Sequence, residues 1–267
     1  MNGIRDLIDL SERTSLVTGA SGNLGIAICH TLAELGSDLI LVDKAPTEVS
    51  KLASSLSKKW NVKAEGIPCD LELPHERLNL VNKVLTNYKG LNCLINNAAF
   101  VGTNKIEGWN VDFEDQSATT FGRALEVNLI AAFDLSKSFA KILNNSEGGV
   151  IINIASIYGI SAPDWELYKG TDMSNPAAYG ASKAGLIQLT KWLASTMAPN
   201  IRVNSISPGG IFRDQPKEFV ERYISKTPLR RMATEGDIQG AIAYLASDMS
   251  KYVTGQNLVI DGGWGII

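Results

Sequence analysis

The chain has 267 residues, of which 45% are hydrophobic and 20% are charged, and its formal net charge is −3. A chain of this length can bury one large core, and we expect a single domain over residues 1–267. The weak negative charge, without a basic stripe, argues against nucleic-acid partners, and no apolar run is long enough for a membrane span.

The N-terminal residues and the cysteines indicate the compartment. Residues 1–10 are interrupted by acids and lack the continuous apolar run of a secretory signal. Cys29, Cys69 and Cys93 are odd in number, widely spaced and set among apolar residues. This pattern suits buried thiols better than disulfides or a metal site. We therefore expect a cytoplasmic protein that binds neither a metal nor a membrane.

Short apolar runs alternate with longer helical stretches along the chain. The runs lie near residues 15–20, 38–43, 62–68, 91–96, 149–155, 201–206 and 257–260. This alternation predicts an α/β fold in which parallel strands are joined by right-handed crossovers.

The first apolar run breaks into a glycine turn that leads into a helical pattern. Glycines let backbone N–H groups approach a pyrophosphate, and the dipole of the following helix favours its negative charge. The turn therefore predicts a dinucleotide-binding cradle that consists of Gly19, Ser21, Gly22, Asn23, Leu24 and Gly25.

Acidic residues end the second and third apolar runs. Asp43 can accept hydrogen bonds from both ribose hydroxyls and would repel a 2′-phosphate, which favours NAD over NADP. The alternative is that it caps a helix or solvates the loop before Ala45 and Pro46. Asp70, followed by Leu71, is expected near the adenine, although a turn-forming aspartate would explain it equally well.

Tyr179 and Lys183 lie four residues apart, a spacing that puts both on one helix face. An ammonium roughly 4 Å from a phenol favours phenolate by about 4 kcal/mol at an effective dielectric of about 20. We therefore expect Lys183 to lower the pKa of Tyr179 and to make it an acid/base catalyst. By itself, the spacing is weak evidence, because a Tyr and a Lys four residues apart on a helix usually form a solvated pair.

Further segments carry a family pattern. They are Asn-Asn-Ala-Ala at 96–99, Glu-Val-Asn-Leu at 126–129, the apolar strand that ends in serine at 150–156, Ser-Pro-Gly at 207–209 and Asp-Gly-Gly-Trp at 261–264. With the glycine turn and the Tyr–Lys pair, they make nearly the whole chain resemble the short-chain dehydrogenase/reductase family. Ala99 stands where that family usually has glycine.

The resemblance implies a Rossmann-type, doubly wound, three-layer sheet of about seven strands in the order 3-2-1-4-5-6-7. It implies a cofactor half at about 12–150 and a catalytic and substrate half at about 151–267. It also implies a homodimer or homotetramer that pairs through helices at 115–143 and 177–198.

The resemblance also implies a catalytic tetrad. Tyr179 would be the acid/base, Lys183 would also hold the nicotinamide ribose, Ser156 would bind the reacting oxygen, and Asn128 would position a water. For Ser156 a turn serine, and for Asn128 a backbone-bonded helix amide, would be the structural alternative. Beyond the cradle and the acids, the implied cofactor contacts are Asn97, Ala98, Tyr179, Lys183, Pro208, Gly209 and Ile211.

Three departures from the family pattern bear on the substrate. Asn23 replaces a common glycine, and its tolerance of left-handed backbone keeps the cradle feasible. About ten extra residues separate Ser156 from Tyr179, and they place Trp165 and Tyr168 as walls for a sugar-like substrate, unless the segment is a self-packed loop or an oligomer contact.

The third departure is Arg213, which stands where the family often has threonine. It could bind an anionic substrate group or could be a solvated surface residue. The sequence thus favours an NAD(H)-preferring alcohol dehydrogenase or carbonyl reductase for a small polar, sugar-like substrate. The alternatives are an NADP-dependent keto(acyl) reductase, whose phosphate Lys44 could accommodate, and a non-catalytic dinucleotide sensor.

Overall fold

A computed structural model of the protein describes residues 3–100 and 106–266. The strands are β1 (Thr14–Thr18), β2 (Asp38–Asp43), β3 (Ala64–Pro68), β4 (Cys93–Asn96), β5 (Val150–Ile154), β6 (Arg202–Pro208) and β7 (Asn257–Ile260). They form one parallel sheet in the order β3-β2-β1-β4-β5-β6-β7. The expected α/β fold and strand order are confirmed.

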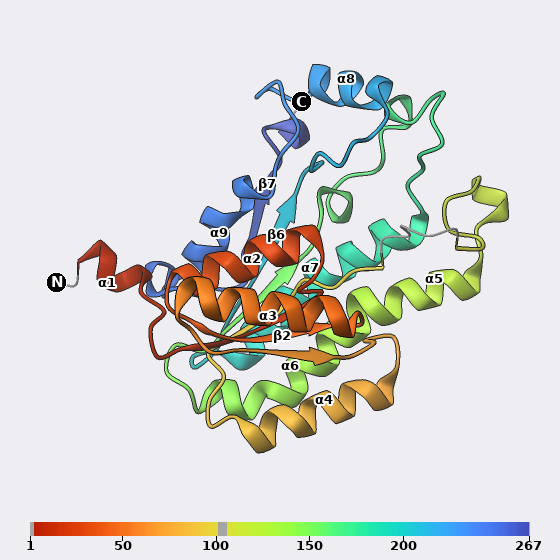
Figure 1. Ribbon diagram of the computed structural model, residues 1–267. Helices are drawn as coiled ribbons and strands as arrows, with labels where there is room; N and C mark the ends of the chain where they lie inside the picture. The colour runs from red at the N-terminus through yellow and green to blue at the C-terminus, as the bar shows by residue number, and fades with distance from the viewer. Residues whose placement is uncertain (1–2, 101–105, 267) are drawn as a thin grey trace.

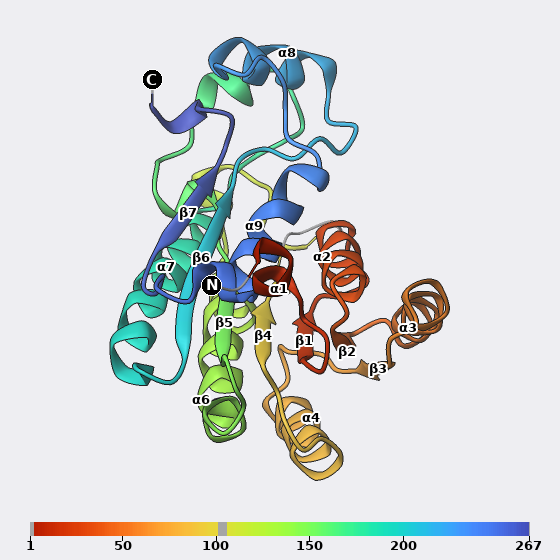
Figure 2. The same cartoon turned by 90° about the vertical axis from the view of Figure 1, so that its left-hand side faces the viewer.

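Helices cover both faces of this sheet (Figure 2). One face carries α2 (Asn23–Glu34), α3 (Pro46–Trp60) and α9 (Gly236–Ala246). The other carries α4 (Pro74–Asn87), α6 (Ala131–Asn144) and α7 (Ala177–Met197). Because side chains alternate along a strand, neighbouring strand residues enter opposite cores: Val17 packs with α2 and Leu16 with α6.

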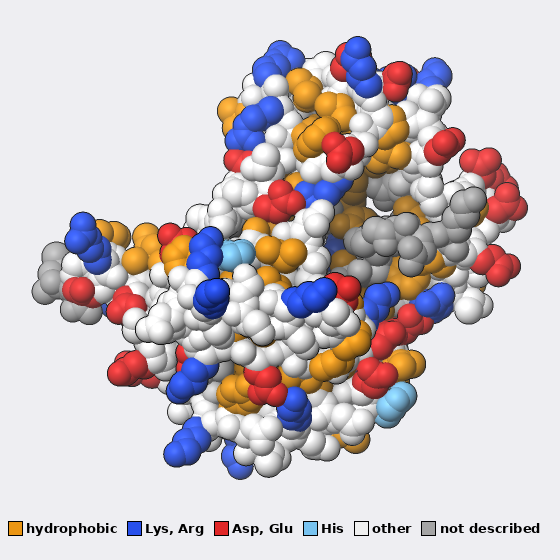
Figure 3. All heavy atoms as spheres, viewed as in Figure 1, with side chains coloured by type: hydrophobic (Ala, Val, Ile, Leu, Met, Phe, Trp, Pro, Cys, Tyr) orange, Lys and Arg blue, Asp and Glu red, His pale blue; other side chains and the backbone are white. Residues whose placement is uncertain are grey.

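The remaining elements are short or lie at the ends of the sheet. They are α1 (Ile4–Ile8), α5 (Ala118–Leu125), α8 (Lys217–Lys226), a π-helical turn at Glu126–Ile130, and 3₁₀ turns at Phe113–Asp115, Ile157–Gly159, Trp165–Leu167, Asp248–Ser250 and Trp264–Ile266. Figure 1 shows α8 at the top, beyond the ends of β6 and β7. In the same view, the surface is hollowed between this part and the body of the molecule (Figure 3).

An aromatic cluster holds the part around α8 together. Phe219 and Tyr223 of α8 pack with Tyr168 from the segment after β5 and with Trp264 near the C-terminus. The Tyr223 and Trp264 rings are stacked, with centroids 6.0 Å apart. None of the described helices is both long and apolar enough to cross a membrane.

Candidate active site

The glycine turn between β1 and α2 is tightly closed. Gly19 has a φ of +62°, and a Cβ at this position would lie 2.8 Å from the Ala98 Cα. A Cβ on Gly25 would overlap the Gly19 carbonyl oxygen, so glycine lets the first turn of α2 approach the loop. Gly22 is the N-cap, and Asn23 and Leu24 begin the helix, where the first N–H groups have no intrahelical acceptor.

Two features of this turn fit an anionic dinucleotide. The Ser21 Oγ is buried and has no hydrogen-bond partner among the described residues. The unpaired N–H groups at the start of α2 supply donors with the positive end of the helix dipole. A buried polar atom without a partner is costly, so a ligand oxygen at this place would satisfy a group that the protein leaves unpaired.

Asp43, at the end of β2, faces the same turn. Its Oδ2 accepts a hydrogen bond of 2.9 Å from the Ser21 backbone N–H, and its Oδ1 accepts one of 3.3 Å from the Ala45 N–H. Asp43 thus closes a turn before α3, whose N-cap is Ala45 and which has no side-chain capping bond, so the helix-cap alternative is not realised. A carboxylate has about four lone-pair sites, so these two bonds leave capacity for ribose hydroxyls.

The segment after β4 closes the other side of the turn. The Asn97 side chain donates to the carbonyl oxygens of Thr18 and Gly19 at 2.9 and 3.0 Å. The Thr18 Oγ1 accepts hydrogen bonds from the Asn97 and Ala98 backbone N–H groups. Thr18 thus joins the glycine turn to the segment after β4, although the sequence motifs did not mark it as a site residue.

The other expected cofactor residues lie at the same sheet edge. Asp70 accepts a hydrogen bond from the Glu72 N–H, as a turn-forming aspartate does, and Leu71 beside it is buried. Pro208 ends β6, and the Gly209 N–H donates to the Ile260 carbonyl. Ile211 forms an isolated bridge with Ala233. Their contacts with a cofactor stay predictions.

Ser156, Tyr179 and Lys183 come together where β5 meets α7. Ser156 follows β5 and Tyr179 lies in the first turn of α7, and the Ser156 side chain is near enough to the Tyr179 phenol to lower its pKa. The Lys183 ammonium donates to the Ile154 carbonyl at 2.7 Å and lies 5.8 Å from the centroid of the Tyr179 ring. It has three N–H donors, and this is its one hydrogen bond within the described chain, so two donors remain for ribose hydroxyls.

The expected effect of Lys183 on Tyr179 is wrong for this structure. Burial raises the pKa of Tyr179 above its ordinary value, and the neighbouring Ser156 side chain offsets this only in part. The ammonium donates to the carbonyl at the end of β5, and its burial lowers the pKa of Lys183 to about 8. The phenol is therefore protonated at neutral pH.

Asn128 lies in the π-helical turn between α5 and α6, and such turns are frequent at functional sites. Its Oδ1 accepts a hydrogen bond of 2.6 Å from the Phe100 N–H, and its Nδ2 donates to the Ser182 Oγ at 2.9 Å. Both ends of the amide thus bind protein. This observation favours a residue that ties the segment after β4 to α7, and the water-positioning role stays a prediction.

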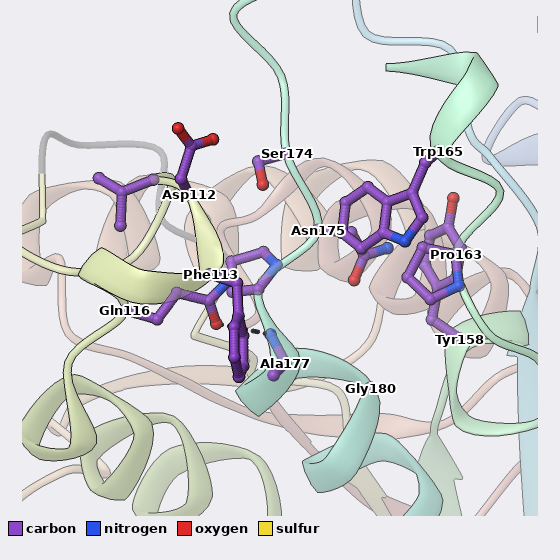
Figure 4. Close-up of a pocket in the computed structure, with 12 residues that line it drawn as sticks. Asp112, Phe113, Gln116, Tyr158, Pro163, Trp165, Ser174, Asn175, Ala177 and Gly180 are labelled. Carbon is purple, nitrogen blue, oxygen red and sulfur yellow. Dashed lines mark hydrogen bonds between the residues drawn. The ribbon is translucent and has the colours of Figure 1, made fainter. Parts of the chain in front are cut away.

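A cavity of about 390 Å³ opens at the start of α7 (Figure 4). Ser156, Tyr179 and Lys183 do not line it, but Gly180, which follows Tyr179, and Tyr158, two residues after Ser156, do. In the figure, Asp112, Phe113 and Gln116 lie on one side, Pro163 and Trp165 lie on the other, and Ala177 and Gly180 at the start of α7 lie below. The full lining is Val111, Asp112, Phe113, Gln116, Tyr158, Pro163, Trp165, Ser174, Asn175, Pro176, Ala177 and Gly180.

The structure supports one expected substrate wall and corrects the other. Trp165 lines the cavity and is 58% exposed. Tyr168 does not line it, because its ring packs against Phe219 and its hydroxyl bonds that of Tyr158 at 2.6 Å. The segment around Tyr168 is therefore partly self-packed, which agrees with the alternative of a self-packed loop.

Arg213 does not line the cavity either. Its guanidinium forms an ion pair with Glu235 and donates to the Phe212 carbonyl. This pairing satisfies the charge within the protein, so an anionic substrate would have to compete with Glu235. Among the described residues, no cluster of three or more His, Cys, Asp or Glu is placed to hold a metal ion.

Sequence reasoning missed several cavity residues. Phe113 and Gln116 lie between the strands β4 and β5, far from any motif, and nothing in the sequence marks them. Tyr158 and Asn175 carried a weak signal, because one lies two residues after Ser156 and the other four residues before Tyr179.

The comparisons with known proteins agree with this geometry. The sequence profile described as enoyl-(acyl carrier protein) reductase matches residues 19–265. A 3-oxoacyl-(acyl-carrier-protein) reductase of Rickettsia bellii is 35% identical over 268 residues, which cover 96% of this chain and 98% of that protein.

Two solved structures are also similar. A short-chain dehydrogenase of Leptospira borgpetersenii with bound NAD+ is 33% identical, with a TM-score of 0.84 and coverage of 99% of this chain and 96% of that one. An NAD+-bound xylitol dehydrogenase is 31% identical, with a TM-score of 0.84 and coverage of 95% and 99%. The chain therefore belongs to the short-chain dehydrogenase/reductase family of oxidoreductases, which act on CH–OH and C=O groups.

Proposed function

We propose that this protein is an NAD(H)-preferring alcohol dehydrogenase or carbonyl reductase for a small, polar, polyhydroxylated substrate. The observation that carries the proposal is the position of Ser156, Tyr179 and Lys183. They lie at the end of β5, on the same sheet edge as the glycine turn and beside the cavity. In an open α/β sheet, this edge is where ligands bind.

The proposed proton chemistry follows from Tyr179. A bound nicotinamide supplies the hydride or accepts it. In carbonyl reduction, the Tyr179 phenol, whose pKa is raised by burial, donates its proton to the carbonyl oxygen; in alcohol oxidation, its deprotonated form accepts the hydroxyl proton. Ser156 donates a hydrogen bond to the same oxygen and stabilises charge that develops on it.

Lys183 and Asn128 act by position in this mechanism. The two remaining Lys183 donors hold ribose hydroxyls, while the bond to Ile154 fixes the ammonium. Asn128 holds α7 through Ser182 and thereby fixes the turn that carries Tyr179. A displacement of about 1 Å in such a cluster can cost on the order of a hundredfold in rate, which explains why a fully bonded amide matters there.

The preference for NAD rests on Asp43. Its carboxylate is fixed at the glycine turn by the Ser21 N–H, and a 2′-phosphate at this place would meet a negative charge. The relatives include proteins with either cofactor: the Leptospira structure holds NAD+, whereas a 29% identical gluconate 5-dehydrogenase of Beutenbergia cavernae holds NADP.

The polar substrate rests on the cavity lining. Flat faces from Phe113 and Trp165 alternate with amides from Gln116 and Asn175, and no lysine or arginine is among the described lining residues. Aromatic faces suit the C–H surfaces of a polyol, and amides suit its hydroxyls. The similarity to a xylitol dehydrogenase points in the same direction.

Turnover with a substrate panel tests the proposal. Polyols, sugars, keto acids and a 3-oxoacyl thioester would each be assayed with NAD(H) and NADP(H). We expect the highest kcat/KM for a polyhydroxylated substrate with NAD(H). Highest activity on the thioester with NADPH would favour the keto(acyl) reductase alternative, which the Rickettsia relative supports. Cofactor binding without any turnover would favour a dinucleotide sensor.

A further inference from the structure

The Asn175 side chain faces the cavity although it is almost completely buried. It is 6% exposed and lines the cavity. Its Nδ2 donates to the Tyr168 Oη at 3.2 Å, whereas no donor among the described residues reaches its Oδ1. This oxygen also keeps some accessible surface. The oxygen is therefore an acceptor that the protein leaves open toward the cavity.

Two tyrosines fix this amide. The Tyr168 hydroxyl, which accepts from Asn175, also shares a hydrogen bond of 2.6 Å with the Tyr158 hydroxyl. Tyr168 is 8% exposed and packs against Phe219 of α8, so its position is set by the aromatic cluster. A buried network of this kind orients its terminal group, because a rotated amide would lose the bond to Tyr168.

The position of Asn175 relates it to the reacting centre. It precedes Tyr179 by four residues and leads into α7, and Gly180 of α7 lines the same cavity. Trp165, on the same side of the cavity in Figure 4, offers a flat apolar face. A ligand in this cavity thus meets one neutral acceptor and one aromatic face from the inserted segment.

We propose that Asn175 is a specificity-determining residue whose Oδ1 accepts a hydrogen bond from a substrate hydroxyl other than the reacting one. This inference rests on the proposed function and narrows its substrate to neutral polyols and the corresponding hydroxyketones. Tyr168 acts through Asn175 and is a positioning residue. A site built to bond a hydroxyl discriminates strongly against analogues that lack it, because its polar group is then left unpaired.

The test compares a hydroxylated and a compact substrate. Xylitol or ribitol and cyclohexanol would be oxidised with NAD+ by the wild type and its variants, and the ratio of kcat/KM values would be recorded. In Asn175→Ala, the ratio should fall by at least about tenfold. Asn175→Asp keeps an oxygen at the same place, and the Tyr168 hydroxyl can donate to its second oxygen in place of accepting from Nδ2, so this variant should restore part of the ratio. Tyr168→Phe should lower the ratio by several-fold, chiefly through a higher KM for the polyol.

Asn110→Ala is the matched control. Asn110 is exposed, donates to the Asp172 carbonyl of the same segment at 2.8 Å, and does not line the cavity. We expect this variant to leave the ratio of kcat/KM values unchanged. A lower ratio in Asn110→Ala would mean that loosening the segment is enough to change selectivity, and it would overturn the specific role of Asn175.

Each other outcome is decisive. Equal losses on both substrates in Asn175→Ala would make Asn175 structural and would overturn the inference. A wild type that prefers cyclohexanol would overturn it as well but would leave the dehydrogenase in place. A wild type that binds NADH but oxidises none of the alcohols would overturn the proposed function and the Asn175 inference with it.

Discussion

Substitution of Asp43 tests the proposed cofactor preference most directly. Its carboxylate ends β2 and bonds the Ser21 N–H at the glycine turn. Asp43→Ala removes both the acceptor for ribose hydroxyls and the negative charge. Asp43→Asn removes the charge and gives up one of the two backbone bonds, but it keeps one acceptor oxygen. The two variants therefore separate the attractive contribution to NAD affinity from the repulsive contribution against NADP.

The magnitude follows from the two contributions. Hydrogen bonds to a charged group contribute about 1.5–3 kcal/mol, so Asp43→Ala should weaken NAD by a corresponding factor. Two unit charges 4 Å apart interact by about 1 kcal/mol in bulk water and about 4 kcal/mol at an effective dielectric of 20. Asp43 is partly exposed, so we expect discrimination against NADP to relax by about 1–3 kcal/mol, or about 5- to 150-fold, in both variants.

The assay is the dissociation constant of NADH and of NADPH, measured by fluorescence titration. Asp38→Asn is the matched control, since Asp38 begins the same strand at the opposite sheet edge, where it accepts from the Lys63 N–H. This control should leave the NADH/NADPH ratio unchanged. A wild type that already binds NADPH more tightly than NADH would refute the interpretation of Asp43, as would an unchanged ratio in both Asp43 variants.

Three further predictions concern catalysis and assembly. Tyr179→Phe should lower turnover by at least about a hundredfold while NADH binding stays within a few-fold; retained turnover would exclude Tyr179 as the acid/base. Burial raises the pKa of Tyr179 above its ordinary value of about 10, so its basic form is still a minority at pH 9 and increases over the whole range below it. We therefore expect kcat/KM for alcohol oxidation to rise from about pH 6 to about pH 9. Carbonyl reduction should not rise over this range, and the opposite pair of slopes would contradict the assignment. Phe133 of α6 and Trp192 of α7 are 40% and 56% exposed, which predicts a homodimer or homotetramer through these helices. Light scattering at micromolar concentration checks this, and a mass of 28.8 kDa would exclude it.

The sequence determined the fold because its signals are local. Alternation of strand-length apolar runs with helical stretches predicts parallel strands, and each run proved to overlap a strand of the sheet. The glycine turn could also be located from the sequence, since Gly19 and Gly25 are positions that no side chain can occupy. The strand order came from the family resemblance, because periodicity does not encode which strands are neighbours.

The tertiary structure decided what the site residues contact. Tyr168 was expected in the cavity wall. Instead, Phe219 of α8, which is distant in sequence, packs against the Tyr168 ring and helps to bury it. The Lys183 ammonium was expected to act on Tyr179, but the Ile154 carbonyl at the end of β5 binds it. Little in the sequence marks Asn175 as a cavity residue, because its place in the cavity wall depends on segments that are distant in sequence. A helix or strand follows from neighbouring residues, whereas burial, pairing and pKa depend on groups that only folding brings together.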